Sequence, residues 1–227
     1  MTDAVVLARL SPADREELYA RARRRCYGRR EVVFHEGDIG ESAVVVHSGC
    51  LAARKTGPGG EAGLIGVLGP GEVAGELALV QPAVRRTVTV FALDPTEVLI
   101  VERGMFAGLG EPTTGSANFL LAALTGRIRR LEEDLALALL GTSEDRIAVR
   151  LAALADLCLA GDAPHRGVAV TQQDLASLTG TSRATVNRVL GGLADGGAIA
   201  VRRGRIEVLD RELLMTLLKA GRQDPAG

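Results

Sequence analysis

The chain has 227 residues, of which 47% are hydrophobic and 24% charged, and its formal net charge is −1. This length predicts one large or two ordinary domains, and the apolar content suffices for a full globular core. No apolar run of roughly 18 residues occurs and the N-terminal residues lack a signal-peptide pattern, so we expect a cytoplasmic protein with no membrane association. The three cysteines and three histidines lack metal-ligand spacing, and no metal site is predicted.

Short apolar runs separated by glycine-rich turns dominate residues 28–104. Runs of β-branched residues that recur at intervals of roughly ten residues are typical of an antiparallel sandwich or barrel. The strands expected on this basis lie at residues 31–34, 42–47, 63–68, 87–93 and 97–101. A short helix over residues 12–25 is expected to precede them.

Residues 71–88, GEVAGELALVQPAVRRTV, form a cassette with the residue types of a phosphate site. Gly75 and the residues after it can form one helical turn, whose outward N–H groups attract an anion. Arg86 and Thr87 follow, and an arginine fork beside a hydroxyl suits a phosphodiester. Glu76 can accept a hydrogen bond from a ribose hydroxyl. The alternative interpretation is that the two adjacent arginines belong to a solvated turn.

A long helix is expected over residues 116–140, where apolar residues recur at alternating spacings of four and three. The apolar stripe that they form consists of Ala117, Leu121, Leu124, Ile128, Leu131, Leu135 and Ala138. Packing on its own domain would explain the stripe. We favour a dimer interface through residues 117–138, because a DNA-binding motif follows and such motifs usually work as symmetric dimers. Residues 141–144 end this helix, begin another and form the expected hinge.

Residues 171–191, TQQDLASLTGTSRATVNRVLG, are interpreted as a helix, a glycine turn and a second helix. Thr171 followed by Asp174 predicts a capped helix start. Gly180 tolerates the positive φ of the turn, and Ser182 is a good N-cap for the second helix. The apolar face of that helix consists of Val186, Val189, Leu190 and Leu193. Its outward face carries Arg183, Ala184, Asn187 and Arg188, as in a helix that lies in a DNA major groove. An ordinary helical hairpin with a solvated arginine face is the alternative.

A basic hairpin is expected next, because two short apolar runs at residues 199–201 and 205–208 flank Arg202, Arg203 and Gly204. A helix-turn-helix followed by such a hairpin predicts a winged helix whose wing contacts phosphate. Residues 166–205 hold six arginines against two acidic residues, although the whole chain is slightly acidic. Positive charge is therefore concentrated where DNA would bind.

The order of β-roll, cassette, long helix and winged helix-turn-helix resembles the CRP/FNR family of bacterial transcription regulators. The resemblance extends over about residues 19–209, and its most specific parts are LGPGEVAGELAL at 68–79, Arg86-Thr87 and residues 171–190. It implies an α+β fold. The implied parts are an antiparallel β-roll sensor domain of the cyclic-nucleotide-binding type at residues 1–115, a dimerisation helix at 116–141 and a winged helix-turn-helix DNA-binding domain at 142–227.

The resemblance further implies that a cyclic nucleotide binds in the β-roll as an allosteric effector, with cAMP preferred and cGMP as the alternative. Gly75, Glu76 and the amides that follow would hold the ribose and phosphate, and Arg127 would fix Glu76. In cAMP-binding members the long helix offers polar contacts to the adenine, whereas Leu131 and Glu132 align there in this chain. The implied ligand-binding residues are Gly75, Glu76, Leu77, Ala78, Arg86, Thr87, Arg127, Leu131 and Glu132.

Palindromic double-stranded DNA is the implied partner, together with RNA polymerase, which would contact the loop at residues 161–167 and parts of the β-roll. The implied DNA-binding residues are Thr171, Gln172, Gln173, Ser182, Arg183, Ala184, Asn187, Arg188, Arg202 and Arg203. Members that read TGTGA-type half-sites carry glutamate at the position of Ala184, where it accepts from a cytosine amine. Alanine cannot do so. We therefore predict palindromic guanines, read by Arg183 and Arg188, with relaxed preference at the pair that faces Ala184.

Taken together, these features predict a dimeric DNA-binding transcription regulator under allosteric control by a cyclic nucleotide. A nucleotide-independent regulator of the same fold that always binds DNA is the alternative, since apolar packing of Leu131 can lock the active arrangement. A cyclic-nucleotide hydrolase is a remote third, because no paired carboxylates, metal ligands or positioned base accompany Arg86. We expect no enzymatic activity.

Overall fold

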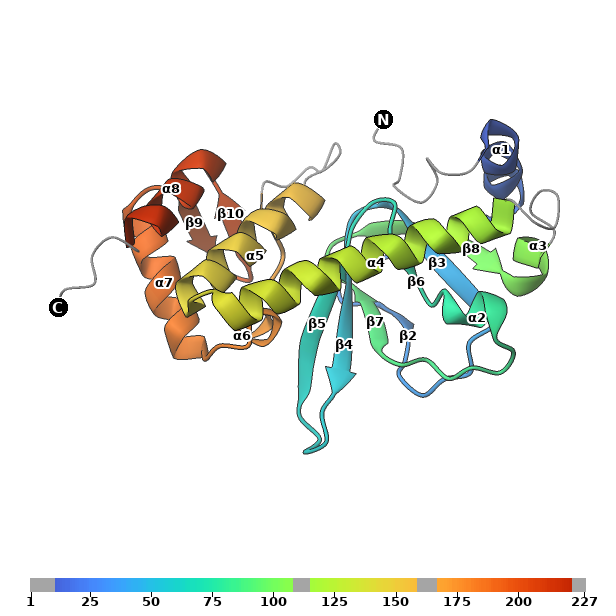
Figure 1. The fold of residues 1–227 in the computed structure, drawn as a ribbon, viewed down its shortest axis with the longest axis horizontal. Helices are drawn as coiled ribbons and strands as arrows, with labels where there is room; N and C mark the ends of the chain where they lie inside the picture. Colours follow the sequence, from blue (N-terminus) through green and yellow to red (C-terminus); the bar gives the residue numbers. More distant parts are fainter. Residues whose placement is uncertain (1–10, 108–114, 159–166, 222–227) are drawn as a thin grey trace. The chain divides into compact units, whose positions relative to one another are not determined.

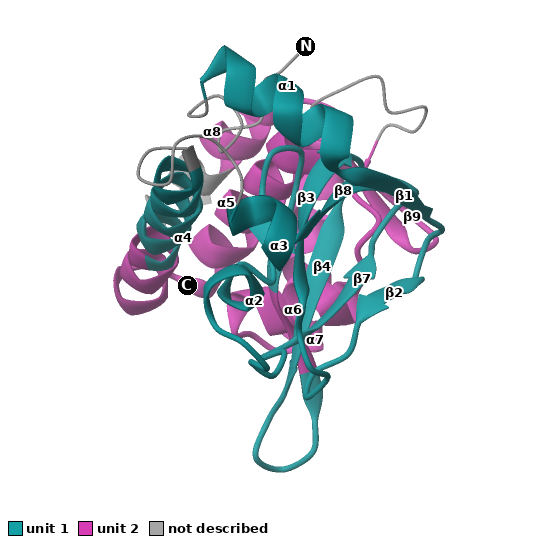
Figure 2. Cartoon of the chain, turned by 90° about the vertical axis from the view of Figure 1, so that its right-hand side faces the viewer, with its two compact units in different colours: residues 1–62, 66–131 teal, residues 63–65, 132–227 magenta. Residues whose placement is uncertain are grey.

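The computed structural model describes residues 11–107, 115–158 and 167–221 (Figure 1). The chain divides into two compact units, one formed by residues 1–62 and 66–131 and the other by residues 63–65 and 132–227 (Figure 2). The boundary between them falls within the long helix α4 (Gly115–Leu140). The mixture of sheets and helices confirms the α+β class that the sequence predicts.

The first unit is built on two four-stranded sheets with antiparallel pairing (Figure 1). One sheet has the strand order β1-β8-β3-β6 and the other has the order β2-β7-β4-β5. The strands are β1 (Arg23–Tyr27), β2 (Val32–Phe34), β3 (Ser42–Ser48), β4 (Leu51–Thr56), β5 (Ala62–Leu68), β6 (Val73–Ala74), β7 (Thr89–Ala92) and β8 (Thr96–Glu102). The predicted β-roll is therefore present.

Strand β3 shows how the core of the first unit is divided. Successive side chains on a strand point to opposite faces, and both faces of β3 are buried. Val44 and Val46 pack among side chains from both sheets, whereas Val45 packs in a second cluster that includes the helices. The helical members of that cluster include Leu18 of α1 (Pro12–Arg21), Phe106 of α3 (Arg103–Ala107) and Phe119 of α4. The unit thus has a sheet-on-sheet layer and a helix-on-sheet layer.

The N-terminal helix is shorter than predicted. Helix α1 ends at Arg21, and Ala22 is already extended, with φ of −70° and ψ of 133°. Residues 23–25, predicted as the last part of the helix, instead belong to strand β1, which spans residues 23–27 and pairs with β8. Sheet hydrogen bonds override the helix propensity of the arginines here. Exposed charges on an edge strand also discourage further pairing, which suits this position.

Helix α4 spans nearly the predicted range and presents two different faces. Phe119 and Ala122 are buried in the core of the first unit. The apolar stripe is exposed along its whole length, with side-chain exposures such as 61% for Leu121, 56% for Ile128 and 59% for Leu135. Packing on its own domain therefore does not account for the stripe.

The second unit is a helical domain with a two-stranded hairpin. Its elements after α4 are α5 (Ser143–Cys158), α6 (Gln172–Thr179), α7 (Arg183–Asp195), β9 (Ile199–Arg202), β10 (Arg205–Val208) and α8 (Arg211–Gly221). Helix α6 begins with the predicted capping box, in which the Thr171 hydroxyl accepts from the Asp174 amide and the Asp174 carboxylate accepts from the Thr171 amide. Gly180 is left-handed, with φ of 60°, and the Ser182 hydroxyl caps α7. The helix-turn-helix is formed as predicted.

Three predictions can be compared only with the described part of the chain. The loop predicted to contact RNA polymerase, residues 161–167, lies outside the described residues except for Gly167. Within residues 11–107, 115–158 and 167–221, no helix is both long and apolar enough to cross a bilayer. The same residues contain no group of three or more histidine, cysteine or acidic side chains able to hold a metal ion.

Candidate functional site

The cassette begins with a turn that brings Gly75 against the side chain of Arg86. Gly75 has φ of +80°, and a Cβ there would collide with Nη1 of Arg86 and lie 3.3 Å from the Ser42 carbonyl oxygen. Both the conformation and the close approach therefore require glycine. Helix α2 (Leu77–Val80) follows, and the amides of Ala78 and Leu79 donate to the carbonyls of the two residues before it, each at 3.0 Å.

Arg86 lies in a partly buried position between carbonyl groups and an aromatic ring. Its Nη2 donates to the Ser42 carbonyl oxygen at 2.7 Å, and its Nη1 donates to the Gly75 carbonyl oxygen at 3.3 Å. The guanidinium carbon lies 4.1 Å from the centroid of the Phe34 ring, which is cation–π geometry. Nε is buried and has no hydrogen-bond partner among the described residues. The guanidinium is thus held in place while its buried Nε–H stays unused.

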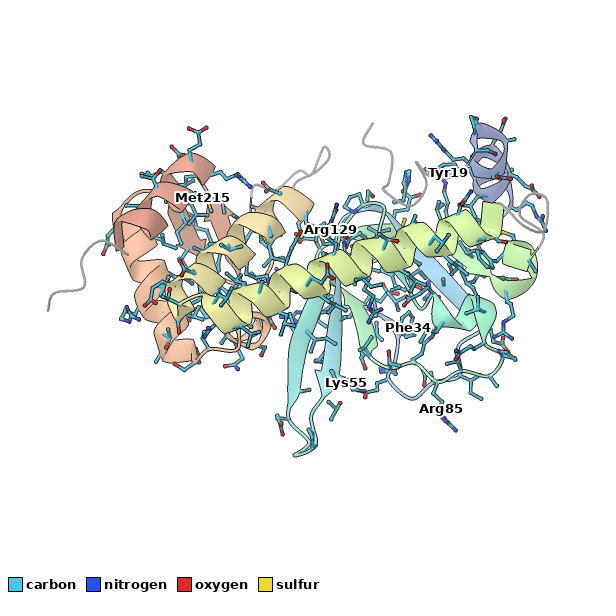
Figure 3. All side chains as sticks on the ribbon, in the orientation of Figure 1. Tyr19, Phe34, Lys55, Arg85, Arg129 and Met215 are labelled. Atoms are coloured by element: carbon cyan, nitrogen blue, oxygen red, sulfur yellow. The ribbon has the colours of Figure 1, made fainter. Side chains whose placement is uncertain are left out.

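The electrostatics at Arg86 favour an incoming anion. Burial lowers the pKa of Arg86 below its ordinary value, while Asp38 and Glu76 act in the opposite direction and favour the charged form. A desolvated cation with an unused N–H gains both charge and hydrogen-bond energy from a phosphate oxygen. Its neighbour Arg85 differs: it is exposed, it donates to the Gly37 carbonyl at 2.8 Å, and its side chain points outward from the loop (Figure 3).

Two buried glutamates of the cassette are paired with arginines of α4. Glu76 is 7% exposed, and its Oε1 accepts from Nη1 of Arg127 at 3.0 Å, so the expected contact between these two residues is present. Glu72 is 8% exposed, accepts from the Gly69 amide at 3.1 Å and forms an ion pair with Arg130. The two arginines stand one turn apart, so that α4 is tied to the cassette at two neighbouring points.

Of the other predicted ligand residues, Ala78 is buried, whereas Leu77, Thr87, Leu131 and Glu132 are exposed. Thr87 is exposed, and its carbonyl oxygen accepts from Nζ of Lys55 at 2.7 Å. Leu131 and Glu132 are exposed on α4, with Leu131 in the apolar stripe at 58% exposure. The structure therefore brings Gly75, Glu76, Arg86 and Arg127 together in one place. The ligand-binding roles of all the predicted residues, including Thr87, Leu131 and Glu132, stay predictions.

Helix α7 presents the predicted face to solvent. Val186, Val189, Leu190 and Leu193 are buried, as expected. The four predicted reading residues, Arg183, Ala184, Asn187 and Arg188, are all exposed. Of the remaining predicted DNA contacts near α6, Thr171 and Gln172 are half-buried and Gln173 and Ser182 are exposed. This separation of faces is what a helix needs to insert into a groove while it stays packed on its own domain.

The wing is formed as predicted, with a basic tip. Strands β9 and β10 pair antiparallel, with Arg202 opposite Arg205, and Gly204 at the turn has φ of +71°. Arg202 and Arg203 are exposed, and Nε of Arg202 lies 3.7 Å from a carboxylate oxygen of Glu207. The exposed guanidinium groups at this tip can reach a phosphate backbone.

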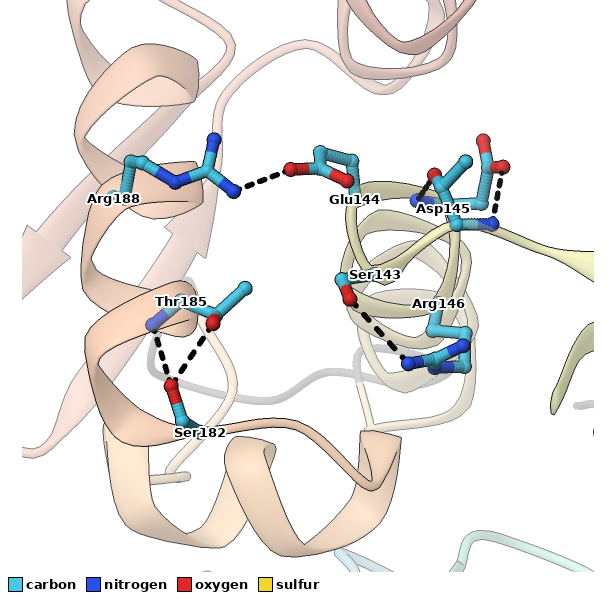
Figure 4. A network of polar contacts seen from close by, with 8 residues as sticks. Ser143, Glu144, Asp145, Arg146, Ser182, Thr185 and Arg188 are labelled. Carbon is cyan, nitrogen blue, oxygen red and sulfur yellow. Dashed lines mark hydrogen bonds and ion pairs between the residues drawn. The ribbon is translucent and has the colours of Figure 1, made fainter.

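Arg188 has a partner that sequence reasoning missed. Its Nη2 donates to Oε1 of Glu144, near the start of α5, at 2.5 Å (Figure 4). This hydrogen bond is the largest cause that lowers the pKa of Glu144 below its ordinary value. The sequence predicts residues 141–144 as a hinge and a helix start, with no contact to α7. No local pattern reveals the contact, because the two residues are 44 positions apart and meet only through packing of α5 against α7.

Phe34, Glu72 and Arg130 were also missed. The sequence gives one indication for Glu72, which follows a Gly-Pro-Gly turn and directly precedes an apolar strand. A glutamate that is buried at such a place is expected to have a charged partner. Arg130 follows Arg127 by three positions and therefore lies on the same side of a helix. Phe34 gave no signal of its own, because an aromatic residue at a strand end is usually part of a core.

Comparisons with known proteins assign both parts of the chain. The family described as "Cyclic nucleotide-binding domain" matches residues 24–111, and the "Crp-like helix-turn-helix domain" matches residues 145–217. The Cyclic AMP receptor protein of Thermus thermophilus is 34% identical over 205 residues, which are 90% of this chain and 92% of that protein. The CRP-like cAMP-activated global transcriptional regulator of Mycobacterium tuberculosis is 27% identical over 190 residues, 83% and 84% of the two chains.

Among solved structures, the catabolite activator protein of Thermus thermophilus has a TM-score of 0.51 at 32% identity, and the match covers 96% of this chain and 99% of that one. The fold and the sites define a transcription regulator that joins a cyclic nucleotide-binding domain to a helix-turn-helix. The chain belongs to the CRP/FNR family. The relatives that match over most of the chain are CRP-family transcription regulators rather than enzymes, so the hydrolase interpretation is set aside.

Proposed function

We propose that the chain is a homodimeric regulator whose affinity for a palindromic operator is controlled by cAMP bound in the first unit. The sensor domain would comprise residues 1–115, the dimerisation helix residues 116–141 and the DNA-binding domain residues 142–227. The observation that carries the proposal is the partly buried Arg86, with its unused Nε, beside Glu76. Because the proposed partner is chromosomal DNA, we also propose that the protein acts in the cytoplasm.

The residues of the cassette suit the two polar parts of a cyclic nucleotide. Arg86 would bind the phosphate, since a guanidinium can offer two parallel donors to its oxygens, and the hydroxyl of Thr87 would add a third. The amides of Leu77 and Ala78 lie in the same turn. Glu76 engages Arg127 through Oε1, and its second oxygen would accept from the ribose hydroxyl. Two relatives named for cAMP support cAMP over cGMP as the ligand.

Calorimetric titration with cAMP and with cGMP tests this assignment. We expect the wild type to bind cAMP with a Kd on the order of micromolar, which corresponds to about 8 kcal/mol. Arg86→Ala should weaken binding at least about 100-fold, because the phosphate loses its charged donor. Arg85→Ala is the matched control, since it removes an exposed arginine at the adjacent position, and it should bind like the wild type. Equal affinity of Arg86→Ala and wild type would refute the site.

The apolar stripe of α4 supports the proposed homodimer. It is uncovered in the single chain and has the spacing of a coiled-coil seam. We expect a two-chain species in sedimentation experiments on the wild type and a single chain for Ile128→Asp, which places a charge in the seam. Ala136→Asp adds the same charge on an exposed position of α4 outside the stripe and should leave the dimer intact. A monomeric wild type at micromolar concentration would contradict the proposal.

Control by the nucleotide is proposed to act through the hinge at residues 140–144. A ligand that binds one arrangement of this hinge more tightly shifts a pre-existing equilibrium. A switch from mostly inactive to mostly active needs about 5.5 kcal/mol of differential binding. In a dimer, this equilibrium would set the recognition helices about 34 Å apart, one turn of DNA.

A nucleotide-independent regulator is the second candidate, and Leu131 is the observation that favours it. An exposed leucine in the apolar stripe, at a position aligned with a polar base contact, can strengthen the dimer without any ligand. Operator binding measured with and without cAMP separates the two candidates. Equal affinity in both conditions would favour the second. Contacts with RNA polymerase through the β-roll are a further part of the proposal.

A further inference from the structure

Glu144 stands on a firmly fixed helix start. Thr142 and Asp145 cap α5 reciprocally: the Thr142 hydroxyl accepts from the Asp145 amide at 3.1 Å, and the Asp145 carboxylate accepts from the Thr142 amide at 2.9 Å. Arg146 then ties this turn to the end of α6, since its Nε donates to the Thr179 carbonyl at 2.9 Å. The backbone that carries Glu144 is therefore held against the helix-turn-helix before any DNA arrives.

From this position Glu144 holds one end of the Arg188 guanidinium. Nη2 of Arg188 donates to Oε1 of Glu144 at 2.5 Å, and the side chains are 68% and 43% exposed (Figure 4). A guanidinium has five N–H donors in a planar fork, and this contact uses one nitrogen. The rest of the fork stays on the outward face of α7. The contact thus orients the arginine without consuming its capacity to bind a base.

We propose that Glu144 is a positioning residue for base recognition, which holds Arg188 so that its remaining donors meet a guanine edge. Guanine presents O6 and N7 as two coplanar acceptors in the major groove, and an oriented fork fits them in a bidentate way. A long, exposed arginine without a partner samples many rotamers and binds any nearby phosphate. The Glu144 carboxylate restricts these rotamers. It also offsets the positive charge of the guanidinium, which would otherwise attract any phosphate. The proposal rests on the proposed function, in which α7 reads DNA.

Two other roles for Glu144 would give different results. If the carboxylate acted only by repelling phosphates, its removal would tighten binding to all DNA sequences equally. If it competed with DNA for Arg188, its removal would tighten binding to the guanine-containing operator most. Positioning predicts the opposite for the operator, namely that selectivity falls when the acceptor is lost. The quantity to measure is therefore the affinity for the guanine-containing operator divided by the affinity for a duplex without those guanines.

The experiment uses the full-length protein and two DNA duplexes. One is the operator selected by the wild type from random DNA, and the other has the guanine pairs that depend on Arg188 replaced. For Glu144→Ala we expect the ratio of the two affinities to fall about three- to tenfold. This loss is part of the discrimination that a complete bidentate contact to guanine provides. Glu144→Gln keeps a carbonyl acceptor and should retain most of the ratio. Glu212→Ala, which removes an exposed carboxylate from the first turn of α8, is the matched control and should retain all of it.

A double-mutant cycle with Arg188→Ala shows whether Glu144 acts through Arg188. In the Arg188→Ala background, Glu144→Ala should leave the ratio unchanged. A ratio that stays at the wild-type value in Glu144→Ala alone, or that rises, would overturn the proposal. If the wild type shows no preference for guanine, the proposed reading role of α7 is overturned, and the positioning role of Glu144 with it. If binding depends on guanine but is not changed by Glu144→Ala, only the positioning role is overturned.

Discussion

Arg86 and Arg188 have the same side chain in opposite surroundings. Arg86 is partly buried between two carbonyl groups and the Phe34 ring, and burial lowers its pKa. Arg188 is 68% exposed and has one carboxylate partner at the surface. The first is fixed by the surrounding fold and the second is fixed by a single neighbour.

This difference matches two kinds of anionic partner. A small phosphodiester offers few contacts, so its site must be desolvated and preorganised to bind well. DNA offers a row of phosphates and base edges, and an exposed arginine can reach them without prior burial. The stability of the first unit should therefore depend on its binding arginine, whereas the stability of the second unit should not.

The largest effect is expected for Gly75→Ala. The added Cβ would collide with Nη1 of Arg86, and the φ of +80° is strained for alanine. We expect the free energy of unfolding to fall by roughly 2–4 kcal/mol and the binding of cAMP to be lost. Gly66→Ala is the control, because no atom lies within 4 Å of a Cβ there. Urea unfolding followed by circular dichroism measures both, and an unaffected Gly75→Ala protein would disprove the tight approach.

Alanine substitutions at the two arginines test the comparison directly. Arg86→Ala leaves the Ser42 and Gly75 carbonyls without these donors and should cost about 1–3 kcal/mol of unfolding free energy. Arg188→Ala removes an exposed side chain and should change stability by no more than about 0.5 kcal/mol. The urea unfolding midpoints of the two variants, each compared with the wild type, measure the two losses of stability. Equal losses would show that burial does not separate the two arginines.

A smaller effect is expected at the wing. Arg203 is exposed and proposed to contact a phosphate. Arg203→Ala should weaken binding to all DNA sequences alike and reduce the slope of log K against log salt by about one. Binding isotherms at several salt concentrations, with operator and with random DNA, provide the measurement. A loss confined to the operator would instead indicate base contact by the wing.

The smallest effect concerns pH. The hydrogen bond from Arg188 lowers the pKa of Glu144. A carboxyl group with a lowered folded pKa stabilises the fold above its unfolded pKa, about 4.3, and this contribution is lost as pH falls through the folded value. Between about pH 6 and pH 3, the wild type should lose more unfolding free energy than Glu144→Gln, by at most about 0.5 kcal/mol because the pair is exposed. Urea unfolding of the wild type and of Glu144→Gln at both pH values shows whether this difference in unfolding free energy has the expected sign.

Local sequence patterns predicted much of the second unit. The capping box at Thr171, the left-handed Gly180 and the N-cap Ser182 each depend on residues within three or four positions. The buried face of α7 follows from helical periodicity in the same way. The predicted end of α1 was wrong, because residues 23–27 form an edge strand of a four-stranded sheet and pair there with β8, about 70 positions away.

The amino-acid sequence by itself determined the order of elements, the apolar stripe of α4 and the residue types of the cassette and the recognition helix, because these depend on composition and short-range spacing; that the stripe is exposed was decided by the structure. Only the tertiary structure decided which charges meet. Glu72 with Arg130 and Glu144 with Arg188 are pairs of residues that lie far apart in the sequence, 44 positions in the second case, whereas the pair of Glu76 with Arg127 was expected from the family resemblance and from no local pattern. The partial burial of Arg86 likewise needs Phe34 and Ser42 from distant strands. Such contacts are set by how whole helices and sheets pack, and no local pattern encodes that packing.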